Sequence, residues 1–154
     1  MVTLPLNATD DAILTALHGW LIHLTRNEYQ QAFAFTHHLV GDDSTPERLR
    51  EQIAFYGDQF NEAVRLPVAG DAKPEHGVMR PNPKAQPAKR LSGGRLLGSY
   101  EGLVTAQSQA DPSFLGEASL QLPFGGKWSD VFATFVMINH EGRLVFTLKS
   151  IYIH

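Results

Sequence analysis

The sequence predicts an α+β domain in which N-terminal helices pack on a curved antiparallel β-meander. Two patterns carry this prediction. Apolar residues recur at helical spacing over the first 64 residues, and they alternate with polar residues over the last third of the chain. The chain has 154 residues, 43% of them hydrophobic, which is enough for one domain with one core. We therefore expect a single domain over residues 1–154.

A first helix is expected to begin after Thr9. Its hydroxyl is a preferred N-cap, and Asp10 and Asp11 place negative charge at the positive end of the helix dipole. Apolar residues then return at helical spacing: Ile13, Leu14, Leu17, Trp20, Leu21 and Leu24. One face of this helix should be buried.

Two more helices are expected before residue 64. After a short break, Asn27 and Glu28 can restart a helix, and the run ends near two histidines at 37 and 38. The apolar stripe of this second helix consists of Tyr29, Ala32, Phe33 and Phe35. The clearest helix start follows, where Ser44 and Thr45 offer a capping hydroxyl before Pro46 at the first helical position and the early acid Glu47. The apolar positions of this third helix are Leu49, Ile53, Tyr56 and Phe60.

An irregular, basic loop is predicted at about 69–94. Prolines at 74, 81, 83 and 87 and glycines at 70, 77, 93 and 94 oppose any regular element there. Residues 73–95 carry six lysines and arginines against one glutamate, a local charge of +5 that leaves −8 for the rest of the chain. This composition favours a solvated loop over a functional lid.

The last third of the chain is predicted to form strands at 95–107, 116–124, 128–139 and 144–153. The second of these alternates cleanly between apolar and polar residues, which is typical of a strand with one wet face. The third has bulky residues on both faces and should be a central strand. Gly125 and Gly126 form one tight turn, and His140 to Gly142 form the next. In the last strand, one face is expected to carry Leu144, Phe146, Leu148 and Tyr152, and the other Val145, Thr147, Lys149 and Ile153. The last three strands should therefore form an antiparallel meander.

The order of these elements resembles the NTF2-like, or cystatin-like, superfamily. The resemblance lies in the run from Trp20 through Tyr29, Ala32 and Phe33, followed by a meander that ends at Leu148, Ile151, Tyr152 and Ile153. It implies a bent sheet and helices around a conical cavity, which some members use for catalysis, some for ligand storage and others leave as core. The resemblance also implies that two copies can pair through the sheet. The irregular insert at 69–94 departs from the pattern.

One carboxylate is a candidate general base. Asp130 lies among large apolar neighbours, where an ionised carboxylate would need partners or would be disfavoured. In ketosteroid-isomerase-like members of the superfamily, a strand carboxylate and a tyrosine act together on an enolisable substrate. That likeness makes Asp130 the candidate catalytic base, with Tyr56 or Tyr100 as the hydrogen-bond donor. The simpler interpretation, that Asp130 accepts hydrogen bonds at the start of its strand, is favoured.

The seven histidines do not predict a metal site. His18 and His23 are five residues apart, about 140° around a helix, and the adjacent His37 and His38 point to different sides. We expect no metal and no cofactor. His18 lies at the edge of the apolar stripe, where it could line a pocket. The residues expected to line a pocket between helices and sheet are His18, Trp20, Trp128 and Phe132.

Composition and motifs exclude several functional classes. The net charge of −3 and the pI of about 6.1 argue against nucleic acid as a partner. The chain has no cysteine, no G-x-S-x-G, no P-loop and no dinucleotide fingerprint. Its apolar runs are too short for a membrane span and it lacks a secretory signal, so we expect no membrane partner and a cytoplasmic location.

Two functions remain open. The favoured one is a non-enzymatic binding module that engages a protein partner or a small apolar ligand, as bacterial immunity proteins of similar fold are thought to do. The alternative is an enzyme of the polyketide-cyclase and ketosteroid-isomerase type with Asp130 as its base. Homodimerisation through the sheet is compatible with either. The first is favoured because no convergent set of polar residues is evident.

Overall fold

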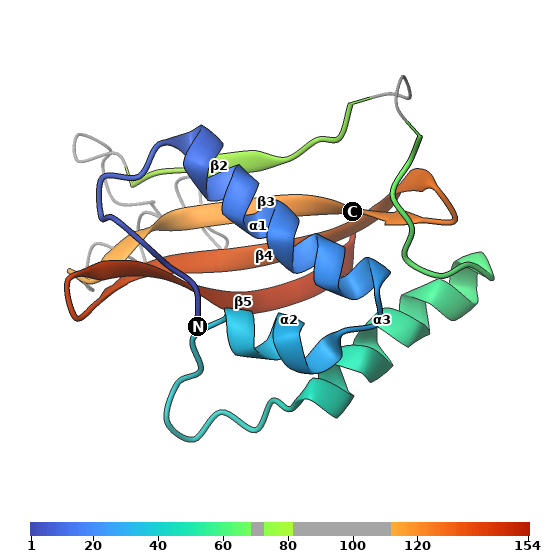
Figure 1. The fold of residues 1–154 in the computed structure, drawn as a ribbon, viewed down its shortest axis with the longest axis horizontal. Helices are drawn as coiled ribbons and strands as arrows, with labels where there is room; N and C mark the ends of the chain where they lie inside the picture. Colours follow the sequence, from blue (N-terminus) through green and yellow to red (C-terminus); the bar gives the residue numbers. More distant parts are fainter. Residues whose placement is uncertain (69–72, 82–111) are drawn as a thin grey trace, which may run out of the picture.

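The computed structural model describes residues 1–68, 73–81 and 112–154. Three helices pack against a five-stranded antiparallel sheet with the strand order β1-β5-β4-β3-β2 (Figure 1). The elements are β1 (Thr3–Leu4), α1 (Asp10–Thr25), α2 (Tyr29–Phe35), α3 (Pro46–Phe60), β2 (Gly77–Met79), β3 (Phe114–Phe124), β4 (Lys127–His140) and β5 (Arg143–Ile153). The predicted α+β class is confirmed. Helix α1 crosses one face of the sheet, and α2 and α3 lie beside β5.

The helix starts follow the predicted local chemistry. The Thr9 side chain accepts a hydrogen bond from the Ala12 amide at 3.2 Å, and the Thr45 side chain accepts one from the Arg48 amide at 3.1 Å. Helix α3 ends at Asn61, which is in the left-handed conformation with φ of 54°. Short-range capping therefore fixes the ends of these helices.

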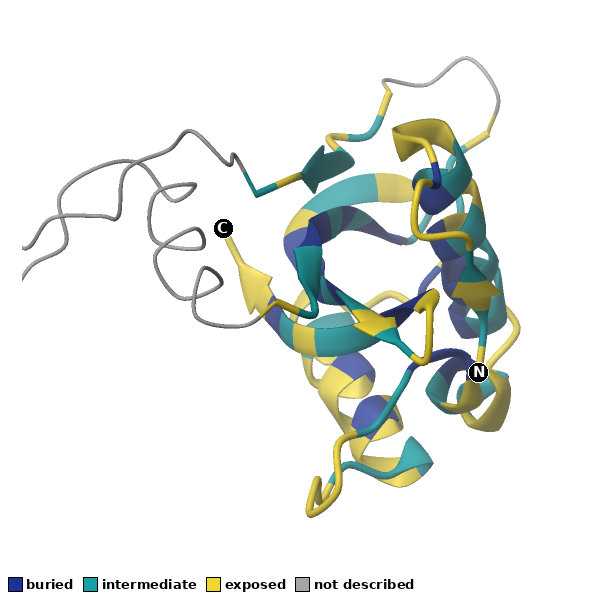
Figure 2. Cartoon of the chain, turned by 90° about the vertical axis from the view of Figure 1, so that its left-hand side faces the viewer, coloured by how far each residue is buried: buried dark blue, intermediate teal, exposed yellow. Residues whose placement is uncertain are grey.

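The meander of β3, β4 and β5 is confirmed. The turn between β3 and β4 contains Gly125 and Gly126, and both have positive φ values that suit glycine. Register shifts interrupt both ladders of the meander. Figure 2 shows the strongly curled sheet, with α1 lying across the open side of the curl.

The core fills the space between α1 and the inner face of the sheet. Trp20 packs edge-on against Phe135 with ring centroids 4.9 Å apart, and Phe135 also contacts Phe146. All three side chains are fully buried. The other large, fully buried side chains are Ile13, Leu17, Leu21, Leu24, Leu120, Leu122, Val131, Met137 and Leu144. Most of the space under α1 is therefore occupied by side chains.

A bulge in β5 corrects the predicted alternation of that strand. Leu148 pairs with Phe135 and Ser150 pairs with Thr134, so Lys149 is an extra residue. After the bulge, the odd-numbered side chains of β5 take the inner face of the sheet that the even-numbered ones occupy before it. Ile151 is therefore buried, whereas Tyr152 is 37% exposed. The regular alternation had placed Tyr152 on the same face as Leu148, and that placement is wrong.

The predicted irregular loop at 69–94 contains a strand. Within it, β2 pairs with β3 through Gly77↔Ser119 and Met79↔Glu117. The approach is close, because a Cβ added at Gly116 would lie 2.3 Å from the Met79 carbonyl oxygen. The rest of this loop, apart from residues 73–76 and 80–81, and the predicted strand at 95–107 lie outside the described residues.

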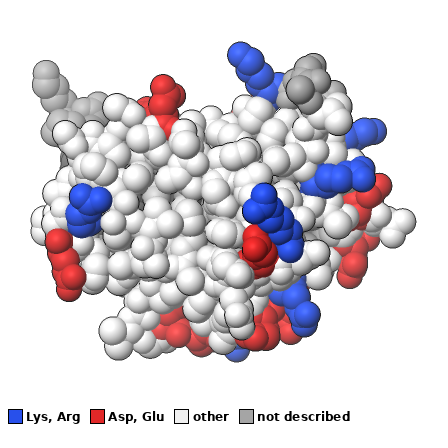
Figure 3. Space-filling model, viewed as in Figure 1, with Lys and Arg blue, Asp and Glu red and all other residues white. Residues whose placement is uncertain are grey.

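Charged side chains lie mainly around the edge of the face that carries α1 (Figure 3). Only Asp10 and Asp11, in its first turn, carry charged groups on α1. Arg80, just after β2, bonds Asp10 at 3.1 Å and the Ala8 carbonyl at 2.7 Å. This contact ties the sheet edge at β2 to the start of α1.

Candidate functional site

Within the described residues, the candidate general base does not share a pocket with a tyrosine. Asp130 is exposed and lies two residues before Phe132, on the face of the sheet away from the helices. The Tyr56 hydroxyl approaches from α3 and donates to the Ile151 carbonyl at 3.1 Å. Tyr100 lies outside the described residues. Asp130 and Tyr56 therefore occupy different sides of the sheet.

The four residues expected to line one pocket lie in separate places. His18 is exposed on α1, and Trp128 lines an open groove with Asp130. Phe132 lines a hollow of about 280 Å³ on the outer face of the sheet, together with Thr134 and other residues of β2, β3 and β5. Trp20 alone among the four lines the cavity between the helices and the sheet that is described next.

A partly enclosed cavity of about 230 Å³ lies between α2, α3 and β5. We call it the α2–α3–β5 cavity. The connection between α2 and α3 and residues 147–150 of β5 form two of its walls. Its apolar floor is made by Trp20, Ala32, Phe33, Leu49 and Leu148. Its volume corresponds to about eight water molecules at liquid density, and it is smaller than the usual pocket for a drug-sized ligand.

Trp20, which lines the cavity floor, has a buried polar atom without a partner among the described residues. Trp20 is fully buried, and its indole Nε1–H has no acceptor among the residues that the structure describes. The indole nitrogen can only donate. A buried donor without a partner is costly, by about 1–3 kcal/mol. An acceptor brought by a ligand or a water would remove that cost.

His38 has a fixed orientation in the cavity wall. Its ring stacks on the Phe33 ring, with ring centroids 3.8 Å apart. Its Nε2 lies 2.7 Å from the Phe33 carbonyl oxygen and 3.2 Å from the Thr36 hydroxyl oxygen. Because a carbonyl can only accept, we assign the proton to Nε2, which leaves Nδ1 as the acceptor. Ser44 Oγ lies 3.4 Å from Nδ1, and Asp42 Oδ2 lies 3.7 Å from it.

The Ser44, His38 and Asp42 cluster is not a catalytic triad. A triad needs the serine and the carboxylate on opposite nitrogens of the imidazole, and here both face Nδ1. The pKa of Asp42 is held below its usual value, mainly by the Ser44 backbone N–H, which donates to Oδ1 at 2.9 Å. The cluster therefore organises the wall of the cavity and supplies polar groups to it.

His37 joins the cavity wall to the sheet. Its backbone amide donates to the Phe146 carbonyl at 2.7 Å, and its carbonyl accepts from the Thr147 hydroxyl at 3.3 Å. Burial lowers the pKa of the His37 ring, and the neighbouring His140 and His38 lower it further. The ring is therefore neutral at pH 7 and can both donate and accept a hydrogen bond.

Arg48 brings a cationic side chain to the cavity and bonds the exposed Asp43 at 2.7 Å. Lys149 also adjoins the cavity, but its ammonium bonds Glu117 at 2.7 Å, and Glu117 lines the hollow on the outer face of the sheet. Glu117 is only 3% exposed although the alternation of its strand had placed it on the wet face, and the ion pair with Lys149 compensates its charge. Arg48 keeps guanidinium donors beyond the one that Asp43 uses.

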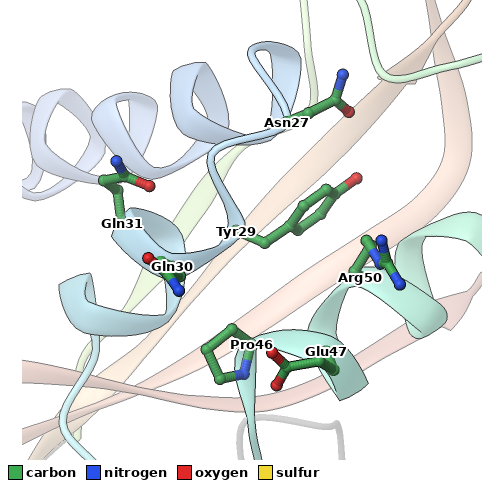
Figure 4. Close-up of a pocket in the computed structure, with 7 residues that line it drawn as sticks. All are labelled: Asn27, Tyr29, Gln30, Gln31, Pro46, Glu47 and Arg50. Carbon is green, nitrogen blue, oxygen red and sulfur yellow. The ribbon is translucent and has the colours of Figure 1, made fainter.

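A second depression lies between the starts of α2 and α3. Figure 4 shows the Tyr29 ring extending from α2 toward the side of α3 that carries Arg50, while Gln31 points away. Its volume is about 680 Å³, and Asn27, Gln30, Pro46 and Glu47 complete its lining. Burial raises the pKa of Tyr29, and Arg50 opposes this effect. Because this groove is more open to solvent, it encloses a small molecule less well than the α2–α3–β5 cavity.

Neither a metal centre nor a membrane-spanning helix is found within the described part of the chain. No three histidine, aspartate or glutamate side chains there are placed to hold a metal ion. No helix among the described residues combines the length and the apolar composition that crossing a membrane requires.

Comparisons of the chain with protein-family models, curated proteins and solved structures give no match. The resemblance to the NTF2-like superfamily stays a prediction.

Proposed function

We propose that this protein is a non-catalytic binding domain of the NTF2-like type and that it holds a small polar ligand in the α2–α3–β5 cavity. The ligand carries at least one hydrogen-bond acceptor. One observation carries the proposal: Trp20, which lines the floor of a partly enclosed cavity, has a buried indole N–H without an acceptor among the described residues. Natural interiors rarely leave such a donor unsatisfied.

One wall of the cavity offers a site for a carboxylate. Arg48 brings positive charge to the lining and keeps guanidinium donors beyond the one that Asp43 uses. The side chains of Thr36 and Gln52 add further hydrogen-bonding groups. An apolar floor with a few polar groups around it is the usual composition of a small-molecule site.

The enzymatic alternative has less support. Asp130 is exposed and lies on the outer face of the sheet, away from the cavity. The Tyr56 hydroxyl already donates to a backbone carbonyl, so it is not poised to stabilise an enolate. Binding of a protein partner and pairing of two copies through the sheet stay predictions.

Titration calorimetry with small carboxylates tests the proposal. We would use benzoate, hexanoate and N-acetylglycine as probes and compare the wild type with Gln52→Trp. Gln52 lies on the exposed side of α3 and lines the cavity, so a large ring there should block entry without disturbing the core. Glu51→Trp is the matched control, because Glu51 is the adjacent exposed residue of α3 and does not line the cavity.

We expect at least one probe to bind the wild type and the Glu51→Trp variant with similar affinity and to bind Gln52→Trp at least tenfold more weakly. Failure of all three probes to bind would contradict the proposal. Equal binding to the wild type and to Gln52→Trp would place the ligand elsewhere and would also contradict it.

A further inference from the structure

The cavity opens onto a free piece of sheet edge. Strand β1 pairs with β5 only at Leu144 and Val145. Past that point, the Phe146 carbonyl accepts from the His37 amide, and the Ile151 carbonyl accepts from the Tyr56 hydroxyl. Both acceptors therefore face away from β4, on the side of α2 and α3. Between these two occupied carbonyls lies the segment of β5 that lines the cavity.

The backbone of Leu148 is directed into this gap. In an antiparallel ladder, the amide and carbonyl groups of alternate residues point to the same side of the strand. Phe146 pairs with Met137 and directs its carbonyl away from β4, so Leu148, two residues later and paired with Phe135, presents its N–H and C=O to the same side. The bulge begins only after Leu148. No described residue outside the sheet bonds to the Leu148 amide or carbonyl.

We propose that the ligand of this cavity is a small N-acylated amino acid, whose single amide pairs with the Leu148 backbone and whose carboxylate binds Arg48. The inference rests on the proposed function and specifies its ligand class. One amide presents a donor and an acceptor, as the Leu148 backbone does. Arg48 lines the same cavity, and a guanidinium binds a carboxylate through two parallel hydrogen bonds.

The free edge of β5 is short, which favours a single amide over a longer peptide strand as the ligand. Added strands need a row of open backbone groups. Here Phe146 and Ile151 already have partners on that side, so only the backbone around Leu148 is open. The cavity volume of about 230 Å³ also suits a molecule of the size of N-acetylglycine better than several residues of peptide.

An amide-to-ester comparison tests the inference. N-acetylglycine and acetoxyacetate have the same shape and the same carboxylate, but the ester lacks the N–H that would donate to the Leu148 carbonyl. We expect calorimetry on the wild-type protein to give about tenfold weaker binding of acetoxyacetate, since one hydrogen bond contributes about 0.5–1.5 kcal/mol net. In ¹⁵N–¹H spectra, N-acetylglycine should move the Leu148 amide proton downfield and slow its exchange.

A pair of arginine variants tests the carboxylate contact. Arg48→Gln should weaken N-acetylglycine about tenfold and leave the binding of the neutral N-acetylglycine methylamide unchanged. Arg50→Gln is the control, because Arg50 lines the open depression between the starts of α2 and α3 and not the α2–α3–β5 cavity. Equal affinity of the amide and the ester, or an unmoved Leu148 amide, would overturn the inference. In that case, binding of benzoate or hexanoate that Gln52→Trp abolishes would leave the proposed function standing.

Discussion

Replacement of Thr134 by valine should stabilise the protein. Thr134 is 3% exposed, and its hydroxyl has no hydrogen-bond partner among the described residues. A buried hydroxyl without a partner costs about 1–3 kcal/mol compared with an apolar group of the same shape. Valine keeps the β-branched shape that suits a strand. Thr134→Val should therefore raise the free energy of unfolding by about 1–2 kcal/mol.

Thr36 provides the matched control. It is 5% exposed, and its hydroxyl donates to the Phe33 carbonyl at 3.1 Å and lies 3.2 Å from His38 Nε2. Thr36→Val removes these contacts, so it should lower the free energy of unfolding by about 1 kcal/mol or more. The two isosteric changes thus have opposite signs because the two hydroxyls differ in their partners.

Urea unfolding followed by circular dichroism measures both variants. For a domain of this size, each kcal/mol corresponds to about 2–4 °C in Tm, so a thermal melt should give the same order: Thr134→Val highest and Thr36→Val lowest. If Thr134→Val destabilised the protein as much as Thr36→Val does, the Thr134 hydroxyl would have a partner and the reasoning would be wrong.

Acid should weaken the fold through His76, whose pKa is lowered to about 4 by burial and, to a lesser extent, by His18. Since the ring binds its proton more readily in the unfolded chain, its contribution is complete above pH 6.5 and is lost as the pH falls toward 4. The difference between the ordinary pKa of 6.5 and the lowered pKa of about 4 corresponds to about 3.4 kcal/mol of folding free energy for a fully buried ring. Because this ring is partly exposed, we expect a contribution of about 1.5 kcal/mol. Urea unfolding at several pH values between 4 and 7 measures this effect. The free energy of unfolding should depend less on pH in His76→Gln than in the wild type, and an unchanged pH dependence would count against this assignment. Gly116→Ala should cost about 3 kcal/mol or more, because φ is +137° and the new Cβ would meet the Met79 carbonyl oxygen. Gly142→Ala, at φ of +81° in open space, should cost only about 1 kcal/mol, and equal losses in the two variants would show that the close β2–β3 approach is not what constrains Gly116.

Local patterns predicted most of the elements. The caps at Thr9 and Thr45 and the glycines at the β3–β4 turn act over three or four residues, so the sequence reveals them directly. Strand β2 was missed because it has only three residues, Gly77–Met79, and they stand among prolines. Its pairing depends on the close approach to Gly116, which is distant in sequence.

The cavity could not be predicted because its walls come from four separate segments. The apolar pattern predicts Trp20 as a pocket residue, but it predicts Trp128 and Phe132 in the same pocket, and these two lie elsewhere. One signal was available: the apolar positions of β5 change phase between Leu148 and Ile151, which indicates a bulge. That bulge adjoins the backbone that lines the cavity.

The indole resonance of Trp20 is the most direct probe of the proposed binding site. The chain has two tryptophans, so a ¹⁵N–¹H spectrum shows two indole signals, and Trp20→Phe identifies which one belongs to Trp20. We predict that N-acetylglycine moves the Trp20 indole proton downfield, as an acceptor reaches it, and leaves the Trp128 signal in place. A Trp20 signal that stays fixed at saturating ligand would contradict the account.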